Sequence, residues 1–465
     1  MLTFRDIRSL PIPYFQKYLQ KGSVCGCEKT ISCKRMWPLF HASFAETDGC
    51  LIVKNDTEFA GTVFDFPYVT DGGDVDAAMD ELDAYCLATY TKLRFIGLEE
   101  AEASYVLKRY PRTTFTDART YRDYIYLRTD LAEMNGKKYA GQRNHIHKFL
   151  SLYPDAIYRR VTNADRKELL SFLREWKKEE LVKKSADAKR EFAIDVAFVS
   201  EADFDYFRAG CVLVDGKVKA FCVGEKARDT VVIHAEKALH AYEGINVYLV
   251  REYAKNNPDV TYLNREDDAG EKGLRTSKTQ YHPLMLLSEY FVDVKNELDD
   301  LKSIPSLKTP RLTLNGLKET DVQDYYRLCV DDERNKYWGY DYKKDLHGEL
   351  TEDWFYQGAK RDFKTRSGLN FAIRKDGKLI GETVIFELDN KGECKIGARI
   401  FEEYAGHGYG TEAFEKTVDF ALYTLGMKRV LSSCYKMNTA SVKMHERTFR
   451  KIGEDDEKYY YAREY

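Results

Sequence analysis

Residues 371–388 read FAIRKDGKLIGETVIFEL, two apolar runs on either side of Asp376-Gly377. An Asp-Gly pair between alternating apolar residues is a strong signal for a β-hairpin with a two-residue turn. A second stretch, CVLVDGKVKAFCVGEK at residues 211–226, has the same form around Asp215-Gly216. The sequence therefore predicts two hairpins of one kind and, with them, an internal repeat.

The likeness continues beyond the hairpins. Each is followed by a third strand, a glycine-containing loop, a segment of helical period and a fourth strand. The third strands are predicted at Thr230–Glu236 and Cys394–Ile400, the helices at Asn246–Asn256 and Thr411–Leu425, and the fourth strands at Thr261–Leu263 and Arg429–Ser433. We interpret the two segments as copies of one β-β-β-α-β unit. Residues 1–150 are expected to contain a third, degenerate copy, with a helix at Asp74–Thr89.

The composition is that of a globular protein. The 465 residues include 73 Lys+Arg and 76 Asp+Glu, and 43% are hydrophobic, which excludes wholesale disorder. The net charge of −3 argues against a protein that simply coats nucleic acid. Because no run of about 18 apolar residues occurs and the N-terminus does not resemble a signal peptide, we expect a cytoplasmic protein with no integral membrane contact.

Cysteine usage agrees with that compartment. Cys25, Cys27 and Cys33 lie close together in the sequence, and the other seven of the ten cysteines are scattered. No second ligand pair with zinc-site spacing follows, so we expect reduced structural thiols and no metal site.

Length and linkers predict three domains. At roughly 150 residues per domain, 465 residues correspond to about three. Two of the ten prolines fall at Pro305 and Pro310, which places a boundary near residue 304, and a softer boundary lies near Tyr153-Pro154. The expected domains are 1–153, 154–303 and 304–465. The expected fold class is α+β (mixed α/β), with twisted, mostly antiparallel sheets flanked by helices.

The third strand of the C-terminal copy leads into the loop Ala405-Gly406-His407-Gly408-Tyr409-Gly410-Thr411 and then into an amphipathic helix. Glycines allow backbone N–H groups to close around an anion, and a helix N-terminus adds its positive dipole end. Tight turns also use glycine, so the loop alone is weak evidence. With the hairpin before it and Asn438-x-x-Ser441 after it, the pattern indicates a pyrophosphate cradle.

About residues 308–465, from the opening Thr-Pro-Arg-Leu-Thr-Leu to a strand near Tyr459–Ala462, resemble GNAT acetyltransferases, and among them the ribosomal-protein N-terminal acetyltransferase-like branch. The resemblance implies acetyl-CoA, or another acyl-CoA, as cofactor and a primary amine on a small molecule or peptide as acceptor. By position it implies cofactor contacts from Ile400, Phe401, Gly406, His407, Gly408, Tyr409, Gly410, Thr411, Asn438 and Ser441.

Such a transfer needs a base for the amine and can use an acid for the leaving thiolate. Glu382, on the second hairpin strand, is the candidate base, and a solvated strand carboxylate is the alternative. His445 and Tyr435 are the candidate acids. Ala405 stands where the family usually has Gln or Arg, and Phe449 replaces a usual glycine. A domain that has kept the fold and lost the activity is therefore also an open interpretation.

The middle copy has a single glycine, Gly244, in the corresponding loop ALHAYEGINVYLV. A CoA pyrophosphate would find fewer free N–H groups there, which implies another donor or none. Charged residues gather instead around two strand ends, where buried ion networks are often functional. The candidate substrate residues are His234, Glu236, Lys237, Asn264, Arg265, Glu266, Asp267, Arg275 and Lys278, with ordinary structural ion pairs as the alternative. The basic residues of 136–149 are interpreted as phosphate contacts or as a solvated helix face.

The strings GKKYAGQRNHIHKF (136–149), HAEKA (234–238), NREDDAG (264–270) and GLRTSKTQYHP (273–283) resemble a bacterial family related to the C-terminal catalytic domain of phosphatidylglycerol lysyltransferase. Such proteins contain two GNAT-like halves. The resemblance implies acyl or aminoacyl transfer, with aminoacyl-tRNA as a donor. The leading hypothesis is a bifunctional N-acyltransferase. The alternatives are an aminoacyl-tRNA-dependent aminoacyltransferase and a non-catalytic regulatory protein built on degenerate GNAT folds.

Overall fold

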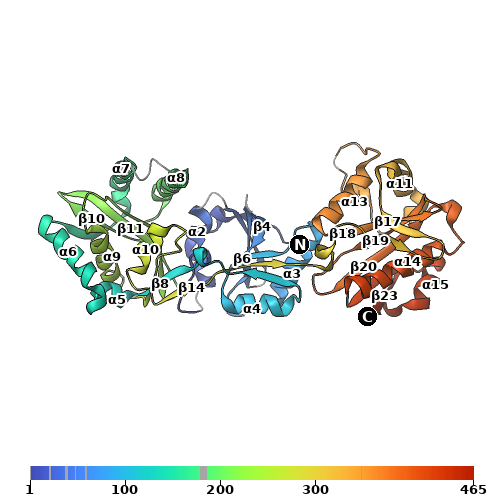
Figure 1. Ribbon diagram of the computed structural model, residues 1–465, viewed down its shortest axis with the longest axis horizontal. Coiled ribbons are helices and arrows are strands. Elements are labelled where there is room, and N and C mark those ends of the chain that lie inside the picture. The colour runs from blue at the N-terminus through green and yellow to red at the C-terminus, as the bar shows by residue number, and fades with distance from the viewer. Residues whose placement is uncertain are drawn as a thin grey trace. The chain divides into compact units, whose positions relative to one another are not determined.

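A computed structural model describes residues 2–19, 22–36, 40–47, 49–57, 60–178, 186–346 and 348–465. The chain forms two compact units. The first comprises Met1–Leu82, Arg94–Ser104 and Phe115–Val292, and the second comprises Asp83–Leu93, Tyr105–Thr114 and Asp293–Tyr465. Three mainly antiparallel sheets flanked by helices make up the fold (Figure 1), which confirms the predicted α+β class.

The first sheet has the order β1-β2-β3-β4-β6-β15-β7, with β5 beside β3. Its strands are β1 (Arg5–Asp6), β2 (Phe40–Thr47), β3 (Cys50–Thr57), β4 (Gly61–Phe64), β5 (Tyr68–Val69), β6 (Arg94–Leu98), β7 (Thr113–Thr116) and β15 (Tyr290–Val294). The helices in this part of the chain are α1 (Ile12–Phe15), α2 (Ile31–Met36), α3 (Val75–Ala88) and α4 (Glu100–Arg109). The run β2-β3-β4-α3-β6, in which β6 is parallel to β4, has the order of the predicted repeat unit.

The second sheet has the order β14-β8-β13-β12-β11-β10-β9. Its strands are β8 (Asp123–Leu127), β9 (Ile157–Arg160), β10 (Arg208–Val214), β11 (Lys217–Ala227), β12 (Thr230–Ala238), β13 (Tyr262–Asn264) and β14 (Met285–Leu287). Its helices are α5 (Arg128–Glu133), α6 (Ala140–Leu152), α7 (Arg166–Trp176), α8 (Ala186–Glu201), α9 (Ile245–Lys255) and α10 (Lys272–Thr279).

The third sheet has the order β16-β17-β18-β19-β20-β21-β23-β22. Its strands are β16 (Leu307–Lys308), β17 (Thr313–Gly316), β18 (Gly368–Lys375), β19 (Lys378–Phe386), β20 (Glu393–Ile400), β21 (Arg429–Tyr435), β22 (Arg450–Glu454) and β23 (Lys458–Glu464). Its helices are α11 (Val322–Val330), α12 (Asp332–Asn335), α13 (Trp354–Thr365), α14 (Tyr409–Phe420) and α15 (Thr439–Thr448), and a π-helical turn, Ala421–Leu425, ends α14.

The two predicted hairpins are present and alike in detail. Asp215 and Gly216 have φ of 51° and 70°, and Asp376 and Gly377 have φ of 50° and 81°, the left-handed values that a two-residue hairpin turn requires. In both hairpins a β-bulge shifts the register, between Val212 and Leu213 in one and between Ile373 and Arg374 in the other. Each bulge lies the same distance before its turn, so the repeat extends to the irregularities of the strands.

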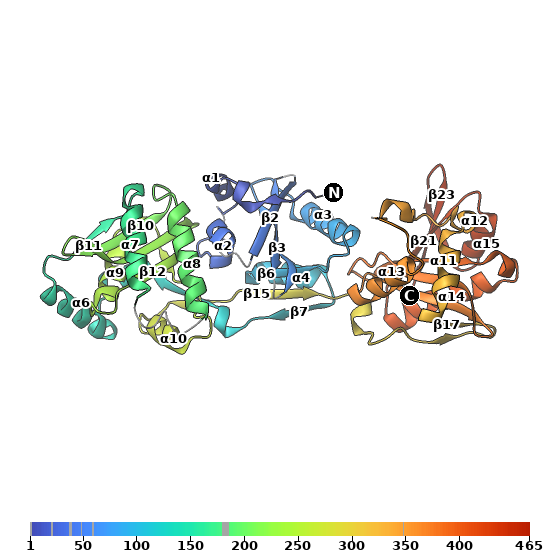
Figure 2. The same cartoon turned by 90° about the horizontal axis from the view of Figure 1, so that it is seen from above.

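The second and third sheets carry helices on both faces. In the second, alternate residues of β10 and β11 pack against α5, α6 and α9 on one face and against α7 and α8 on the other (Figures 1 and 2). In the third, α14 packs on one face and α11 with α13 on the other. Side-chain alternation along buried strands is therefore what holds each three-layer core together.

Each of these two sheets opens at one place. The parallel strands β12 and β13 pair from Thr230–Tyr262 to Val232–Asn264, and β20 and β21 pair from Glu393–Arg429 to Lys395–Leu431. β20 and β21 both run on beyond their three pairs, and β12 runs on past the end of the three-residue β13, so backbone on the facing sides is left unpaired. We call the two gaps the middle splay and the C-terminal splay.

The expected domain limits of 1–153, 154–303 and 304–465 stay a prediction. The strands of the first sheet come from residues 5–116 and 290–294, those of the second from 123–287 and those of the third from 307–464. Within the described ranges, no helix is both long enough and apolar enough to span a membrane.

Candidate functional sites

The loop before α14 has the geometry of an open cradle. Gly406 and Gly408 have φ of 78° and 76°, and Gly408 caps α14 without any side chain bonded to the first helical N–H groups. A Cβ placed on Gly406 would meet no atom within 4 Å. Because the first N–H groups of a helix have no intrahelical acceptor, this end of α14 offers free donors to an anion.

The guanidinium of Arg311 lies beside the cradle. Its Nη1 donates to the carbonyl of His407 at 2.9 Å, its Nε donates to Glu412 at 2.6 Å, and its guanidinium lies 4.6 Å from the ring centroid of Tyr409. His407 and Tyr409 stack on one another. Sequence reasoning missed Arg311, because its place beside the loop depends on the folding of β17 against β18; its only signal was its position in the opening Thr-Pro-Arg-Leu-Thr-Leu.

The other residues expected to contact the cofactor lie around the C-terminal splay. Ile400 ends β20, and its side chain lies 3.5 Å from the position of a Cβ on Gly410. Phe401 is buried against α11 and α13. Asn438 caps α15 by accepting from the N–H of Ser441 at 3.2 Å. The cradle and Ile400 are therefore brought together, whereas Phe401 points into the core and Asn438 is occupied by its helix.

Glu382 is fully engaged. It is buried, its Oε1 accepts from Arg399 Nε at 2.5 Å and its Oε2 accepts from Tyr325 at 2.7 Å. Burial would disfavour the charge of Arg399, but the charge of Glu382 more than compensates, so the guanidinium pKa is raised. This carboxylate is therefore not solvated, and both of its oxygens are already occupied by hydrogen bonds within the fold.

His445 is a core residue. It is 2% exposed, and its ring packs against Phe414, Phe449 and Tyr461. Its Nδ1 bonds the carbonyl of Ser441 and its Nε2 bonds the hydroxyl of Ser432, both at 2.7 Å. A carbonyl accepts only, so Nδ1 carries the proton and Nε2 accepts. Burial lowers the pKa of this imidazole, and both nitrogens are used by the fold.

Tyr435 is the most accessible of the three predicted catalytic side chains. It ends β21 on the part of the strand that has left β20, and it is half-buried. Its ring lies 5.6 Å from that of Tyr337. Across the described part of the chain, the Tyr435 hydroxyl has no hydrogen-bond partner, so its proton is not committed to the fold.

The corresponding helix ends of the other two sheets are closed. A Cβ on Gly244, which caps α9, would lie 2.3 Å from the carbonyl oxygen of His145, because α6 crosses this point. At α3, Asp74 Oδ1 accepts from the N–H groups of Asp76 and Ala77 at 2.9 and 3.2 Å. A helix packed across one end and a carboxylate bonded to the other both exclude a pyrophosphate, so α14 alone of these three ends is open.

The middle splay holds a buried chain of charged groups instead. His234, on β12, bonds Glu266 Oε1 through Nδ1 at 3.0 Å, and its Nε2 lies at an ion-pair distance of 3.6 Å from Glu225 Oε2. Burial lowers the pKa of the His234 imidazole, but Glu225 and Glu266 outweigh it and raise that pKa to about 9. This histidine is therefore protonated at neutral pH.

Arg265 stands beside this chain. Its Nε and Nη2 donate to Glu236 at 3.0 and 2.6 Å, and its guanidinium lies 4.5 Å from the ring centroid of Tyr281. Arg265 is 6% exposed, and its Nη1 is a buried donor without any hydrogen-bond acceptor. Buried donors are nearly always paired in folded proteins, so this one indicates a missing acceptor.

The remaining predicted residues of the middle copy support the strand ends. Asn264 bonds Asp123, and Lys278 donates to the backbone carbonyls of Arg265 and Asp267. Burial lowers the pKa of Lys278 and raises that of Asp267 to about 6. The other two lie apart, since Lys237 pairs with Glu191 and Asp195, and Arg275 pairs with Asp268.

Comparisons with known proteins match both parts of the chain. The family described as phosphatidylglycerol lysyltransferase, C-terminal, matches residues 24–293, and the acetyltransferase (GNAT) domain matches residues 311–448. The crystal structure of a conserved protein of unknown function from Bacteroides thetaiotaomicron VPI-5482 is 28% identical with a TM-score of 0.59, and the match covers 63% of this chain and 100% of that one.

Two further relatives match parts of the chain. The SPbeta prophage-derived uncharacterized N-acetyltransferase YokL of Bacillus subtilis (strain 168) is 28% identical over 85 residues, 18% of this chain and 48% of that protein. The chain thus spans about half the length of this curated relative. A GNAT-family acetyltransferase from Bacillus anthracis is 20% identical with a TM-score of 0.30, over 34% of this chain and 98% of that one.

The raised pKa of His234 predicts a pH dependence of stability. The folded value of about 9 exceeds the unfolded value of roughly 6.5, so the contribution of His234 is fully present below the unfolded value and is lost as pH rises through 9. We expect the unfolding free energy to fall by up to about 3 kcal/mol on this account. Urea unfolding at pH 6.5 and 9.5 measures the fall, which His234→Gln should remove and His147→Gln, an exposed control on α6, should keep. Equal falls in the two variants would contradict the assignment.

Proposed function

We propose that this protein is an N-acyltransferase with two separate transfer sites. The chain belongs to the phosphatidylglycerol lysyltransferase C-terminal family, and its residues 311–448 match a GNAT acetyltransferase domain. The C-terminal domain would transfer an acetyl group from acetyl-CoA to a primary amine of a small molecule or peptide. The first unit would transfer a second acyl or aminoacyl group at the middle splay. Both sites would work in the cytoplasm.

The observation that carries the C-terminal proposal is the open end of α14. A pyrophosphate would fit there because Gly406 leaves open space, the helix offers free N–H groups, and the guanidinium of Arg311, although paired with Glu412, is held at the loop by the His407 carbonyl. Ile400, beside Gly410, would contact the pantetheine arm along the unpaired edge of β20. When bound, acetyl-CoA supplies the thioester that the amine attacks.

The residues around the C-terminal splay suggest how protons move. Tyr435, with its unpartnered hydroxyl at the end of β21, would donate a proton to the leaving thiolate. Glu382 already accepts from Arg399 and Tyr325, so we assign it the positioning of these two side chains in place of direct proton transfer. The amine would then lose its proton to solvent. His445, inside the core, would hold α15 against β21.

The first test introduces a side-chain carboxylate next to the cradle by mutation. Gly410 lies in the first turn of α14, and a Cβ there makes only an ordinary contact with Ile400 at 3.5 Å. Gly410→Asp should therefore keep the fold and even stabilise the helix end by roughly 0.3–1 kcal/mol, while its carboxylate repels the pyrophosphate. We expect acetyl-CoA affinity, measured by calorimetry on the full chain, to fall about tenfold or more.

Gly410→Asn is the matched control, since it has the same shape without the charge. It should change the affinity only a few-fold. An equal loss in the two variants would mean that size and not charge matters, and a wild-type protein that binds no CoA would remove the C-terminal proposal.

The second test concerns the proton donor. Tyr435→Phe should lower kcat with the best amine from a screen of polyamines and peptides by about 10²–10⁴-fold, the usual contribution of an acid, and leave KM for acetyl-CoA nearly unchanged. His445→Gln should lower the melting temperature but retain the kcat of the folded protein. Full activity in Tyr435→Phe would contradict the assigned role.

The observation that carries the N-terminal proposal is the unpaired, buried Nη1 of Arg265. A carbonyl or phosphate oxygen of a substrate in the middle splay is the acceptor that this donor lacks. Glu236 and Glu266, which already pair with Arg265 and His234, would also attract an ammonium group such as the α-amine of an aminoacyl ester. Because α6 closes the end of α9, CoA is not the proposed donor here, and aminoacyl-tRNA is. Binding of such a ligand without transfer is the alternative that the same donor supports.

The third test measures whether Arg265 takes part in the aminoacyl transfer reaction. The full chain is incubated with labelled lysyl-tRNA and vesicles that contain phosphatidylglycerol, and then with a pool of other aminoacyl-tRNAs and amines. Arg265→Lys should lower transfer by about 10²–10³-fold, as does the loss of one preorganised donor. Arg208→Lys, at a similar paired guanidinium bonded to Asp259, is the matched control and should retain it. Binding of aminoacyl-tRNA without transfer would favour the non-catalytic alternative, and neither binding nor transfer would remove the proposal.

A further inference from the structure

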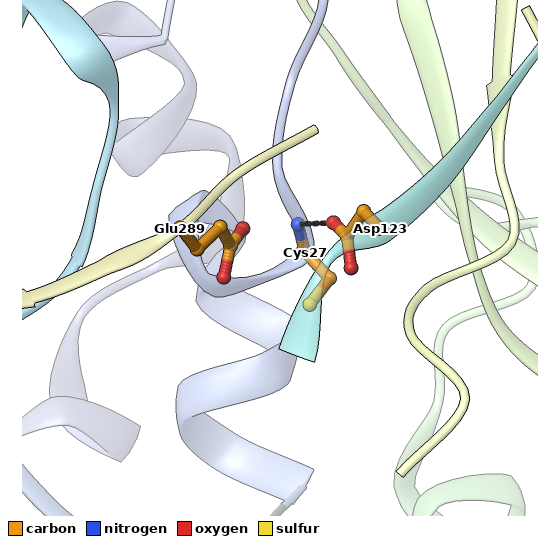
Figure 3. A group of neighbouring side chains, drawn as sticks. All are labelled: Cys27, Asp123 and Glu289. Carbon is orange, nitrogen blue, oxygen red and sulfur yellow. Dashed lines mark hydrogen bonds between the residues drawn. The ribbon is translucent and has the colours of Figure 1, made fainter. Parts of the chain in front are cut away.

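Three side chains that are far apart in the sequence meet in the interior of the first unit. Cys27 begins the short 3₁₀ helix Cys27–Lys29, Asp123 begins β8, and Glu289 lies in the turn between β14 and β15. One thiol sulfur and one carboxylate oxygen from each acid lie within 4.8 Å of one another, all in a buried setting. Figure 3 shows the two carboxylates facing the cysteine from opposite sides.

The carboxylates lack the partners that their burial calls for. Asp123 is 0% exposed; its Oδ2 accepts from the N–H of Cys27 at 2.7 Å and from Asn264 at 2.6 Å, but its Oδ1 has no hydrogen-bond partner. Glu289 Oε1 is likewise buried without a partner, and no described residue donates a hydrogen bond to this carboxylate. Unpaired buried carboxylate oxygens are costly, so a group that is not part of the chain is expected between them.

Lys29 and Lys34, on the same segment as Cys27, do not provide the missing partner of the two carboxylates. Lys29 pairs with Glu102 at 2.5 Å, and Lys34 pairs with Glu28 and Asp65 at 2.9 and 3.0 Å. The chain also makes room for Glu289, since a Cβ on Gly26 would lie only 2.1 Å from Glu289 Oε1. Glycine at this position thus allows the carboxylate to lie directly against the backbone before Cys27.

We propose that Cys27, Asp123 and Glu289 bind a zinc ion. One thiolate with two carboxylate oxygens is a donor set that zinc accepts, and three protein ligands leave one position of a tetrahedral ion for a further ligand. Calcium and magnesium prefer oxygen alone and more ligands than this cluster provides. On binding, the Cys27 thiol releases its proton to solvent as the zinc–sulfur bond forms.

The zinc ion would have a structural role in the first unit. It would connect the segment before α2, the start of β8 and the turn into β15, which belong to two different sheets. Asp123 also holds Asn264, the last residue of β13, next to Arg265 and Glu266. Zinc at this position would therefore fix the base of the middle splay without contacting a substrate there.

The test measures metal on the full chain, purified without a chelating tag. Inductively coupled plasma mass spectrometry should find zinc in stoichiometric amount, and metal-stripped protein titrated with Co²⁺ should show a thiolate-to-cobalt charge-transfer band. Cys27→Ser should lose the band. Asp123→Asn and Glu289→Gln should weaken binding by more than the roughly 10–100-fold that the loss of an outer-sphere partner costs.

Cys25→Ser is the matched control, because Cys25 is a buried thiol two residues away whose sulfur donates to the carbonyl of Gly26. It should keep both the zinc and the cobalt band. A folded, metal-stripped wild-type chain that binds neither Zn²⁺ nor Co²⁺ above the Cys27→Ser level would overturn the proposal. If Cys27→Ser does not fold, Glu289→Gln provides the test of the site, because this substitution removes no hydrogen bond. An unchanged metal content in Glu289→Gln would equally overturn the proposal.

Discussion

Two pairs of parallel strands, each joined over only three residues, create the gaps at which both proposed sites lie. β20 separates from β21 after Lys395, and β12 continues after Val232 past the end of the three-residue β13. The backbone freed in this way lies near the N-terminus of the helix that follows, as Ile400 does beside Gly410 of α14. Each gap is lined by residues from the strand ends that flank it.

The three copies differ in what lies across the N-terminus of this helix. At α14 the glycine loop leaves the end open, at α9 the backbone of α6 covers it, and at α3 the Asp74 carboxylate occupies it. The same β-β-β-α-β frame therefore presents one open helix end and two closed ones. The middle copy has charged side chains around its splay, among them His234, Arg265 and Glu266.

The parts of the fold that depend on local chemistry could be predicted from the sequence. Asp376-Gly377 specifies its hairpin because both residues must adopt left-handed angles, and so the repeat was visible. Long-range contacts could not be predicted in the same way. The residue type of Glu382 and His445 agrees with catalysis, but their partners come from α11 and from the core around β21. Arg311, and the meeting of Cys27 with two distant carboxylates, depend entirely on the tertiary fold.

The strand order of the first sheet has a consequence for how the chain is made. β15 lies between β6 and β7, and its end bonds both neighbours, from Val294 to the carbonyl of Leu93 and from Lys295 to that of Arg112. Every strand of the second sheet is synthesised in the interval between β7 and β15. At ordinary ribosomal speeds that interval lasts roughly ten to thirty seconds. The N-terminal sheet therefore cannot be completed until the second sheet has been synthesised. Until then the edges of β6 and β7 that pair with β15 have no partner.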